Sequence, residues 1–231
     1  MISRTQIKDR LTSQKHMSEA LILNLFLAFS GGFQDAYTYV VRDNVFANAQ
    51  TGNIVLMSTY LLEGSVKKGL MYLFPLCSFM AGIFIADNVD YYLKHAKKLH
   101  WRQMILIAEI IILLISGFIP LQLNMLCNCL ISFSCALQVQ AFKTLHGNAY
   151  ASTMCIGNIR SGVTAFSSFL RSHNKKDLKK AFDYLIVITV FGIGAGVGGN
   201  LSVHYGQHII WVCPVILVLC FVMMGLEKKS K

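Results

Sequence analysis

The stretch "VFANAQTGNIVLMS", residues 45–58, interrupts a chain that is otherwise rich in long apolar runs. Polar or glycine residues occupy its middle: Asn48, Gln50, Thr51, Gly52 and Asn53. The apolar run after the break, 51–63, forms at most about 20 Å of helix at about 1.5 Å per residue, whereas the hydrocarbon core of a bilayer is about 30 Å thick. The stretch therefore predicts a polar break followed by a helix that is too short to cross a membrane.

Composition places this break in a membrane protein. Of the 231 residues, 55% are hydrophobic and 14% are charged, whereas charged residues make up about a quarter of a typical soluble domain. The apolar residues form blocks such as 20–29 and 104–118, which are typical of membrane-spanning helices when extended to about 20 residues. We expect an all-α polytopic membrane protein with the lipid bilayer as its partner.

Basic residues mark the expected cytoplasmic side. The formal net charge is +10, and the Lys and Arg residues lie between and beyond the apolar blocks, as the positive-inside rule predicts. Aromatic residues are not interleaved with them, so no nucleic-acid partner is expected. The clusters are Arg4, Lys8, Arg10 and Lys15; Lys94, Lys97, Lys98 and Arg102; Arg171, Lys175, Lys176, Lys179 and Lys180; and Lys228, Lys229 and Lys231.

Several kinds of chemistry are not indicated. The seven cysteines form no CxxC pair, so neither a disulfide framework nor a metal site is expected. The chain has no HExxH or GxSxG motif, so we do not expect an enzyme. "GAGVGG", 194–199, fits GxGxxG but lies in an apolar helix with no preceding strand, so no nucleotide or other cofactor is expected. Its glycines instead predict faces for close helix packing, at 192 and 196 and at 194 and 198.

The chain also repeats itself. "FSGGFQDAYTYVVRDNVFAN" from Phe29 resembles "FSCALQVQAFKTLHGNAYAS" from Phe133, and Gly52-Asn53-Ile54 corresponds to Gly157-Asn158-Ile159. Each copy then contains a long helix, a polar break, a short segment and two further long helices. The expected organisation is a cytoplasmic segment at 1–17, membrane repeats at 18–119 and 120–226, and a basic cytoplasmic tail at 227–231.

The short segments decide the topology. The second one, 157–171, carries Arg160 and four hydroxyl residues, and an Arg alone costs about 2.5 to 3.5 kcal/mol at the centre of a membrane helix. If neither short segment crosses, the second repeat is inverted and the basic clusters are all cytoplasmic, with Lys67 and Lys68 as exceptions. If both cross, giving eight spans, the loop 94–102 lies outside with its four positive charges. We favour six spans, two half-inserted helices and cytoplasmic termini; the expected spans are 18–41, 68–93, 103–119, 121–145, 177–205 and 208–226.

The two breaks are expected to meet at a buried polar site. An unpaired peptide group in hydrocarbon costs several kcal/mol, so broken helices are tolerated only where they are buried in protein or line water. Inverted repeats direct the N-terminal ends of their half-helices at a shared site. Thr51 is expected to cap the first short helix. The candidate substrate- or ion-binding residues are Gln34, Asp35, Asn48, Gln50, Thr51, Gly52, Asn53, Gln138, Gln140, Gly157 and Asn158.

Asp35 is the acid on which this hypothesis depends most. An intramembrane carboxylate is a functional candidate, here a proton or cation carrier. The alternative is structural, with Asp35 accepting hydrogen bonds from loop N–H groups and holding the break in place. Asp87, Asp90 and Glu109 are expected near the basic cytoplasmic face, in interfacial ion pairs.

The motifs "GGFQDA", "VFANAQTGN", "LQVQAF" and "STMCIGN" together resemble the YoaK-like family of bacterial inner-membrane proteins, over nearly the whole chain. The family's Asp, Phe and Thr-Gly-Asn pattern corresponds to Asp35, Phe46 and residues 51–53. In the second half, a Gln-Asn-Ala typical of many members is Gln138-Val139-Gln140 here, and Thr-Gly is Ile156-Gly157. The resemblance implies about six spans and a bacterial inner-membrane location, and no particular activity.

The leading hypothesis is a small secondary transporter or channel for an unidentified small solute or ion, with its site between the two breaks. Two alternatives from other classes remain open. One is a noncatalytic membrane scaffold or sensor whose breaks shape a surface for a partner. The other is a lipid-binding protein whose basic cytoplasmic loops hold anionic headgroups.

Overall fold

The structure, a computed structural model, describes residues 20–93 and 101–229, with side chains up to residue 226. Several expectations lie outside the described residues: the N-terminal segment 1–17, the first residues of the expected span 18–41, most of the basic loop 94–102, and the side chains of the basic tail.

Helices form almost all of the described chain. They agree with the expected segments to within a few residues at most ends, because each apolar block continues as helix until a glycine, proline or polar turn stops it. The helices are α2 (Leu21–Val41), α3 (Gln50–Leu62), α4 (Val66–Leu93), α5 (Trp101–Ser116), α6 (Asn124–Ala141), α7 (Cys155–Ser172), α8 (Lys175–Tyr205) and α9 (Val212–Lys229), with short 3-10 helices η2 (Leu121–Leu123) and η3 (Gly206–Trp211).

Three stretches of the described chain are long and apolar enough to cross a membrane by length and composition. They are Val66–Leu93, Leu121–Ala141 and Lys175–Leu226, the last of which contains both α8 and α9. Many large apolar side chains on the outside of the molecule remain exposed, such as Phe84 at 71% and Ile111 at 50%. A surface of this kind is stable against lipid, so the protein is a helical membrane protein.

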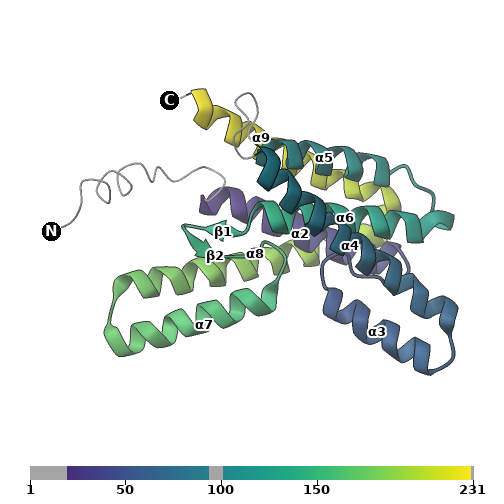
Figure 1. The fold of residues 1–231 in the computed structure, drawn as a ribbon, viewed down its shortest axis with the longest axis horizontal. Helices are drawn as coiled ribbons and strands as arrows, with labels where there is room; N and C mark the ends of the chain where they lie inside the picture. Colours follow the sequence, from purple (N-terminus) through teal and green to yellow (C-terminus); the bar gives the residue numbers. More distant parts are fainter. Residues whose placement is uncertain (1–19, 94–100, 230–231) are drawn as a thin grey trace.

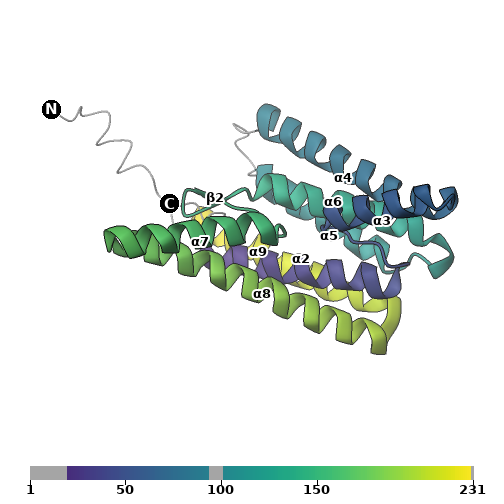
Figure 2. The same ribbon diagram turned by 90° about the horizontal axis from the view of Figure 1, so that it is seen from below.

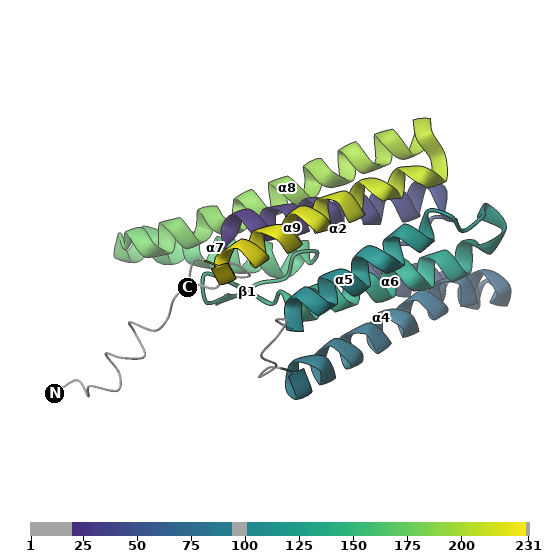
Figure 3. The ribbon, with the colours of Figure 1, turned by 90° about the horizontal axis from the view of Figure 1, so that it is seen from above.

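The long helices run side by side, and successive ones alternate in direction (Figures 2 and 3). Helix α2 packs along α8, and α6 packs along α4, while α5 contacts both α6 and α9. Each short helix folds back on the long helix that follows it, α3 on α4 and α7 on α8. The two short helices lie toward opposite ends of the molecule (Figure 1).

Helices α2 and α8 approach each other closely because glycines line their contact. A Cβ added at Gly194 would meet the backbone of Phe29, and one added at Gly198 would meet the Cα of Phe33 at 2.7 Å. The predicted packing face at 194 and 198 is therefore confirmed. The second predicted face is wrong, because a Cβ at Gly192 or Gly196 would meet nothing within 4 Å.

The expected span 121–145 is confirmed at its start and wrong at its end. The apolar stretch begins at Leu121, with η2 as its first turn, and it ends at Ala141 because a small hairpin follows. Strand β1 (Thr144–Leu145) pairs with β2 (Asn148–Ala149) through His146 and Gly147, which both have positive φ. Positive φ at both central residues is the geometry of a type I′ hairpin turn.

The glycine contact between α2 and α8 gives a test of the packing. We expect Gly194→Leu to lower the midpoint of thermal unfolding in detergent, because overpacking a filled contact costs about 1 to 3 kcal/mol. Gly196→Leu is the matched control, since the same side chain enters open space two residues away on the same helix. Equal midpoints for the two variants, measured by fluorescence-detected size exclusion after heating, would contradict this packing.

Candidate functional site

A polar stripe on α2 forms the base of the site. Ser30, Gln34 and Thr38 recur at four-residue intervals and are all buried. The Gln34 Nε2 group donates to Ser30 Oγ at 3.1 Å, and the Thr38 hydroxyl donates to the Gln34 carbonyl oxygen at 3.1 Å. Because side chains four residues apart lie on one helix face, the sequence itself builds this stripe.

The first break is attached to this stripe by Asp35. Its Oδ1 atom accepts hydrogen bonds from the backbone N–H groups of Asn48 at 2.8 Å and Ala49 at 3.4 Å. The Asn48 side chain in turn donates to the Gly31 carbonyl oxygen at 3.1 Å. These are the bonds expected if Asp35 holds the break in place, and they put a carboxylate directly before the first turn of α3.

The two Gly-Asn pairs perform the same local task. Asn53 Oδ1 accepts from the Phe46 N–H at 3.0 Å, and its Nδ2 donates to the Phe46 carbonyl oxygen at 2.7 Å. Asn158 makes the equivalent pair with Ala151, at 3.5 and 2.7 Å. Each asparagine thus satisfies the peptide group seven residues earlier, which would otherwise be unpaired inside the protein.

The two breaks converge on Gly31. Asn48, from the first break, bonds its carbonyl oxygen, and the Thr153 methyl group, from the second break, packs against its Cα. A Cβ at residue 31 would collide with the Thr153 methyl group, so a larger residue here would require Thr153 to move. The second break is also held by Gln138 of α6, whose Nε2 donates to Ser152 Oγ at 2.8 Å and to the Leu27 carbonyl oxygen at 3.2 Å.

Sequence reasoning missed several members of this cluster. Cys135 donates from its thiol to Gln34 Oε1 at 3.2 Å and so links α6 to α2. Ser152 and Thr153 are buried at the second break. Their position just before a Gly-Asn pair, in "STMCIGN", was the available signal.

Three of the predicted site residues do not join the cluster. Thr51 is exposed and does not cap α3, which begins at Gln50 after Ala49 with no side-chain cap, so that prediction is wrong. Gln140 points to α4, where its Nε2 donates to Asp87 Oδ1 at 2.7 Å. Gly157 is exposed, with nothing within 4 Å of an added Cβ.

Two further predicted residues make only local contacts within the first break. Gln50 donates to the Ala47 carbonyl oxygen and accepts from the Asn53 side chain, and Gly52 lies against the Phe46 ring.

Some polar oxygens of the cluster have no partner. Within the described chain, Asn48 Oδ1, Gln138 Oε1 and Thr153 Oγ1 are buried and make no hydrogen bond. The amide nitrogens of Asn48 and Gln138 donate to backbone carbonyl oxygens, which fixes the amide oxygens as the unused atoms. Such oxygens suit a hard cation or the N–H and O–H groups of a small solute.

Glu109 is the most important residue that the sequence prediction misplaced. It was expected in an ion pair near the cytoplasmic face, but it is fully buried, and neither carboxylate oxygen has a hydrogen-bond partner within the described residues. It lies near Cys135 of α6 and Cys220 of α9, and Cys135 itself donates a hydrogen bond to Gln34. The signal was a single carboxylate inside the apolar run "LIAEIIILL".

Asp87 and Asp90, the other two acids that were expected in interfacial ion pairs, both lie on α4. Asp90 makes an ion pair with Lys143 at 3.7 Å, as expected. Asp87 instead accepts a hydrogen bond from the uncharged Gln140. Both interactions connect α4 to the C-terminal end of α6.

Arg42 was also missed, and its role is structural. It is fully buried after the last turn of α2, and its guanidinium group donates to the carbonyl oxygens of Ser116 at 3.2 Å and Ile119 at 2.9 Å. It also donates to Asn124 Oδ1 at 3.0 Å and to the Tyr37 hydroxyl at 3.0 Å. Arg42 therefore caps the carbonyl end of α5 and joins it to α2 and α6.

No metal centre is evident in the described part of the chain. There, no group of three or more His, Cys, Asp or Glu side chains is placed to hold a metal ion. A site for a cation would therefore have to combine a carboxylate with the amide and hydroxyl oxygens of the breaks.

Comparison with known proteins agrees with this helical architecture. The family described as "Protein of unknown function (DUF1275)" matches residues 23–223. The chain is 24% identical over 213 residues to the UPF0700 transmembrane protein YoaK of Bacillus subtilis (strain 168), which covers 88% of this chain and 93% of that protein. No solved structure matches it. The matched range contains both breaks, and the chain belongs to the DUF1275 family of YoaK-like transmembrane proteins.

Proposed function

We propose that this protein is a small secondary transporter or channel for a small solute or ion, with its path at the interface of two repeats. The observation that carries the proposal is the meeting of two helix breaks at Gly31, where buried oxygens of Asn48, Gln138 and Thr153 lack partners. Broken helices that meet inside a membrane protein are the usual way to build a polar binding site there. The proposed role is noncatalytic.

Reciprocal helix contacts support a duplicated fold. The first helix of each half packs on the third helix of the other half, α2 on α8 and α6 on α4. A glycine makes the close approach in both contacts: an added Cβ at Gly194 meets the Phe29 carbonyl oxygen, and one at Gly82 meets the Phe133 carbonyl oxygen at 2.6 Å. Phe29 and Phe133 are the residues at which the two halves begin to align.

Helix length and polarity support six spans with two half-inserted helices. The 13 residues of α3 amount to about 20 Å, less than the roughly 30 Å hydrocarbon core. Helix α7 is as long as α6 and α9, but it carries Arg160 and several hydroxyl residues, which disfavour a membrane span. Both helices start at the central cluster and lead outward, toward opposite ends of the molecule (Figure 2). We place the protein in a bacterial inner membrane with cytoplasmic termini. Arg42 then lies at the outer end of α2, where the positive-inside rule disfavours a basic residue. Its side chain is fully buried in the protein, which accounts for its position there.

The structure represents a closed state in this scheme. Gln34, Asn48, Gln138 and Asn158 are each at most 5% exposed, so access to the cluster requires one break to move. Asp35 is the residue that can control such a movement, because its carboxylate holds the first break through two N–H groups. A proton or cation on this carboxylate weakens both bonds and frees the segment before α3.

Flux measurements test the proposal. We expect liposomes containing the purified protein to show proton or Na⁺ movement under an imposed gradient, read with an internal pH-sensitive dye or ²²Na⁺. Asp35→Asn should reduce this flux by about tenfold or more, because an amide can neither take up the proton nor bind the cation that the carboxylate carries. Asp90→Asn, in an ion pair at the edge of the bundle, is the control. Flux equal to that of empty liposomes, or unchanged in Asp35→Asn, would overturn the proposal.

Labelling of cysteines tests the topology. Glu63→Cys at the end of α3 and Lys176→Cys at the start of α8 are both exposed positions. With six spans, a membrane-impermeant maleimide labels only the first in intact cells and labels the second after the membrane is opened. Eight spans would put both on the same side, and the unmodified protein measures the background from the native cysteines.

Variants of Glu109 distinguish a structural role of its carboxyl group from a role in transport. Because an unpartnered buried carboxyl group is costly, we expect Glu109→Met to raise the thermal midpoint in detergent. We expect the same variant to abolish flux if the carboxyl group serves transport, whereas Glu109→Gln keeps the shape and most of the stability. A Glu109→Met protein that is less stable than the native one would show that the carboxyl group has a partner which stabilises the fold.

A further inference from the structure

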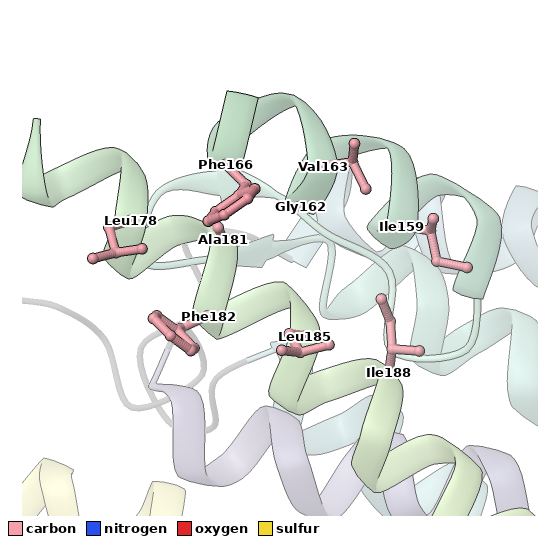
Figure 4. A pocket seen from close by; sticks show the side chains of 9 residues that line it. All are labelled: Ile159, Gly162, Val163, Phe166, Leu178, Ala181, Phe182, Leu185 and Ile188. Carbon is pink, nitrogen blue, oxygen red and sulfur yellow. The ribbon is translucent and has the colours of Figure 1, made fainter. Parts of the chain in front are cut away.

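A groove runs between α7 and α8 on the outside of the molecule (Figure 4). It has a volume of about 390 Å³ and is almost entirely apolar. Side chains from both helices face it, and none of them belongs to the polar cluster at the helix breaks. The principal lining residues are Ile159, Val163 and Phe166 of α7 and Phe182, Leu185 and Ile188 of α8.

The sequence of α7 creates this groove. One face packs on α8, where Gly162 brings the two helices together near the Tyr184 Cβ, at 3.1 Å from an added Cβ. A second face carries the polar residues Arg160, Ser167 and Arg171. The third face is apolar and exposed, and repeats at three- and four-residue intervals through Ile156, Ile159, Val163, Phe166 and Leu170.

The groove lies where lipid can reach it. It follows the first half of α8, within the stretch Lys175–Leu226 that is apolar enough to span a membrane. Val163 is 64% exposed and Leu185 is 56% exposed. In water such a surface is unfavourable, whereas in a bilayer an acyl chain can fill it.

A second pocket, bordered by two lysines, continues the groove at the α7–α8 turn. It has a volume of about 590 Å³, shares Leu178 and Phe182 with the groove, and adds His173, Lys175 and Lys179. Asp183 also borders it, but its carboxylate is 2.9 Å from the ring nitrogen of His146. The two lysines therefore face the pocket beside an acid that already has a partner.

We propose that this groove and pocket bind one anionic phospholipid of the bilayer. One acyl chain lies between α7 and α8, and the phosphate lies between the ammonium groups of Lys175 and Lys179. Basic pockets beside membrane helices hold anionic headgroups in this way. The proposal needs only a helical membrane protein and is independent of any transport activity.

Native mass spectrometry of the full-length protein in a mild detergent tests the site. Purified protein is titrated with phosphatidylglycerol and, separately, with phosphatidylcholine of the same acyl chains. We expect about thirtyfold tighter binding of phosphatidylglycerol, since each lysine close to an anionic group contributes roughly a fivefold change. The double variant Lys175→Gln/Lys179→Gln should lose this preference.

Two controls make the result specific. Lys176→Gln/Lys180→Gln removes the same charge from the same turn outside the pocket, and should keep the preference. Leu185→Asn should weaken binding of both lipids, whereas Ile193→Asn, an equally exposed position beyond the groove, should weaken neither. The elution volume of each variant on size exclusion confirms that it is folded.

Four outcomes would overturn the proposal. Equal binding of the two lipids by the native protein would remove the role of the lysines, and loss of preference in the control pair would reduce it to general surface charge. Competition by inorganic phosphate at equal concentration would mean that the acyl chain contributes nothing. A dimer that dissociates in Leu185→Asn would identify the occupant of the groove as a second copy of the chain.

Discussion

Two breaks in the helices are stable here because side chains pair with peptide groups that the breaks leave open. Water cannot supply these bonds in the interior, so the chain uses side chains instead: the Asp35 carboxylate for the N–H groups before α3, and the Asn53 and Asn158 amides for the peptide groups seven residues earlier. An amide side chain suits this task because it can donate and accept at once. The carboxylate can only accept while it is ionised, so the first break is held by a charged group and the second by uncharged amides.

The remaining architecture follows from how closely the helices approach. Without a strong hydrophobic force between helices in lipid, backbone contact at small residues and hydrogen bonds between helices hold the bundle together. Gly194, Gly198 and Gly82 provide the close contacts, and Arg42 and Gln138 provide bonds from one helix to the backbone of another. These contacts bring the Asn48 and Thr153 segments to the same glycine of α2. The site is therefore a product of the packing, and not of any one motif.

The helices and the two breaks could be predicted from the sequence, because apolar length and Gly-Asn pairs are local signals. The environment of Glu109 could not, since its burial depends on α6 and α9, whose residues lie far away in the chain; the nearby Arg102 pointed to an interfacial position instead. The prediction that Gln140 belongs to the site failed for a related reason. Side chains two residues apart on a helix point in different directions, so Gln140 contacts α4 while Gln138 contacts the second break. The end of α6 depended on a hairpin turn at His146-Gly147, which has turn residues but only two residues in each strand.

Arg42 has a consequence for how the chain is assembled during synthesis. Its guanidinium group lies at the end of the first described helix, but four of its acceptors lie 74 to 82 residues further along, at Ser116, Ile119, Pro120 and Asn124. Until the ribosome has produced the turn between α5 and α6, this charge must stay near the lipid headgroups or in water. The end of α2 therefore reaches its final surroundings only after Asn124 has been made, and the insertion machinery has to hold α2 in a provisional position until then.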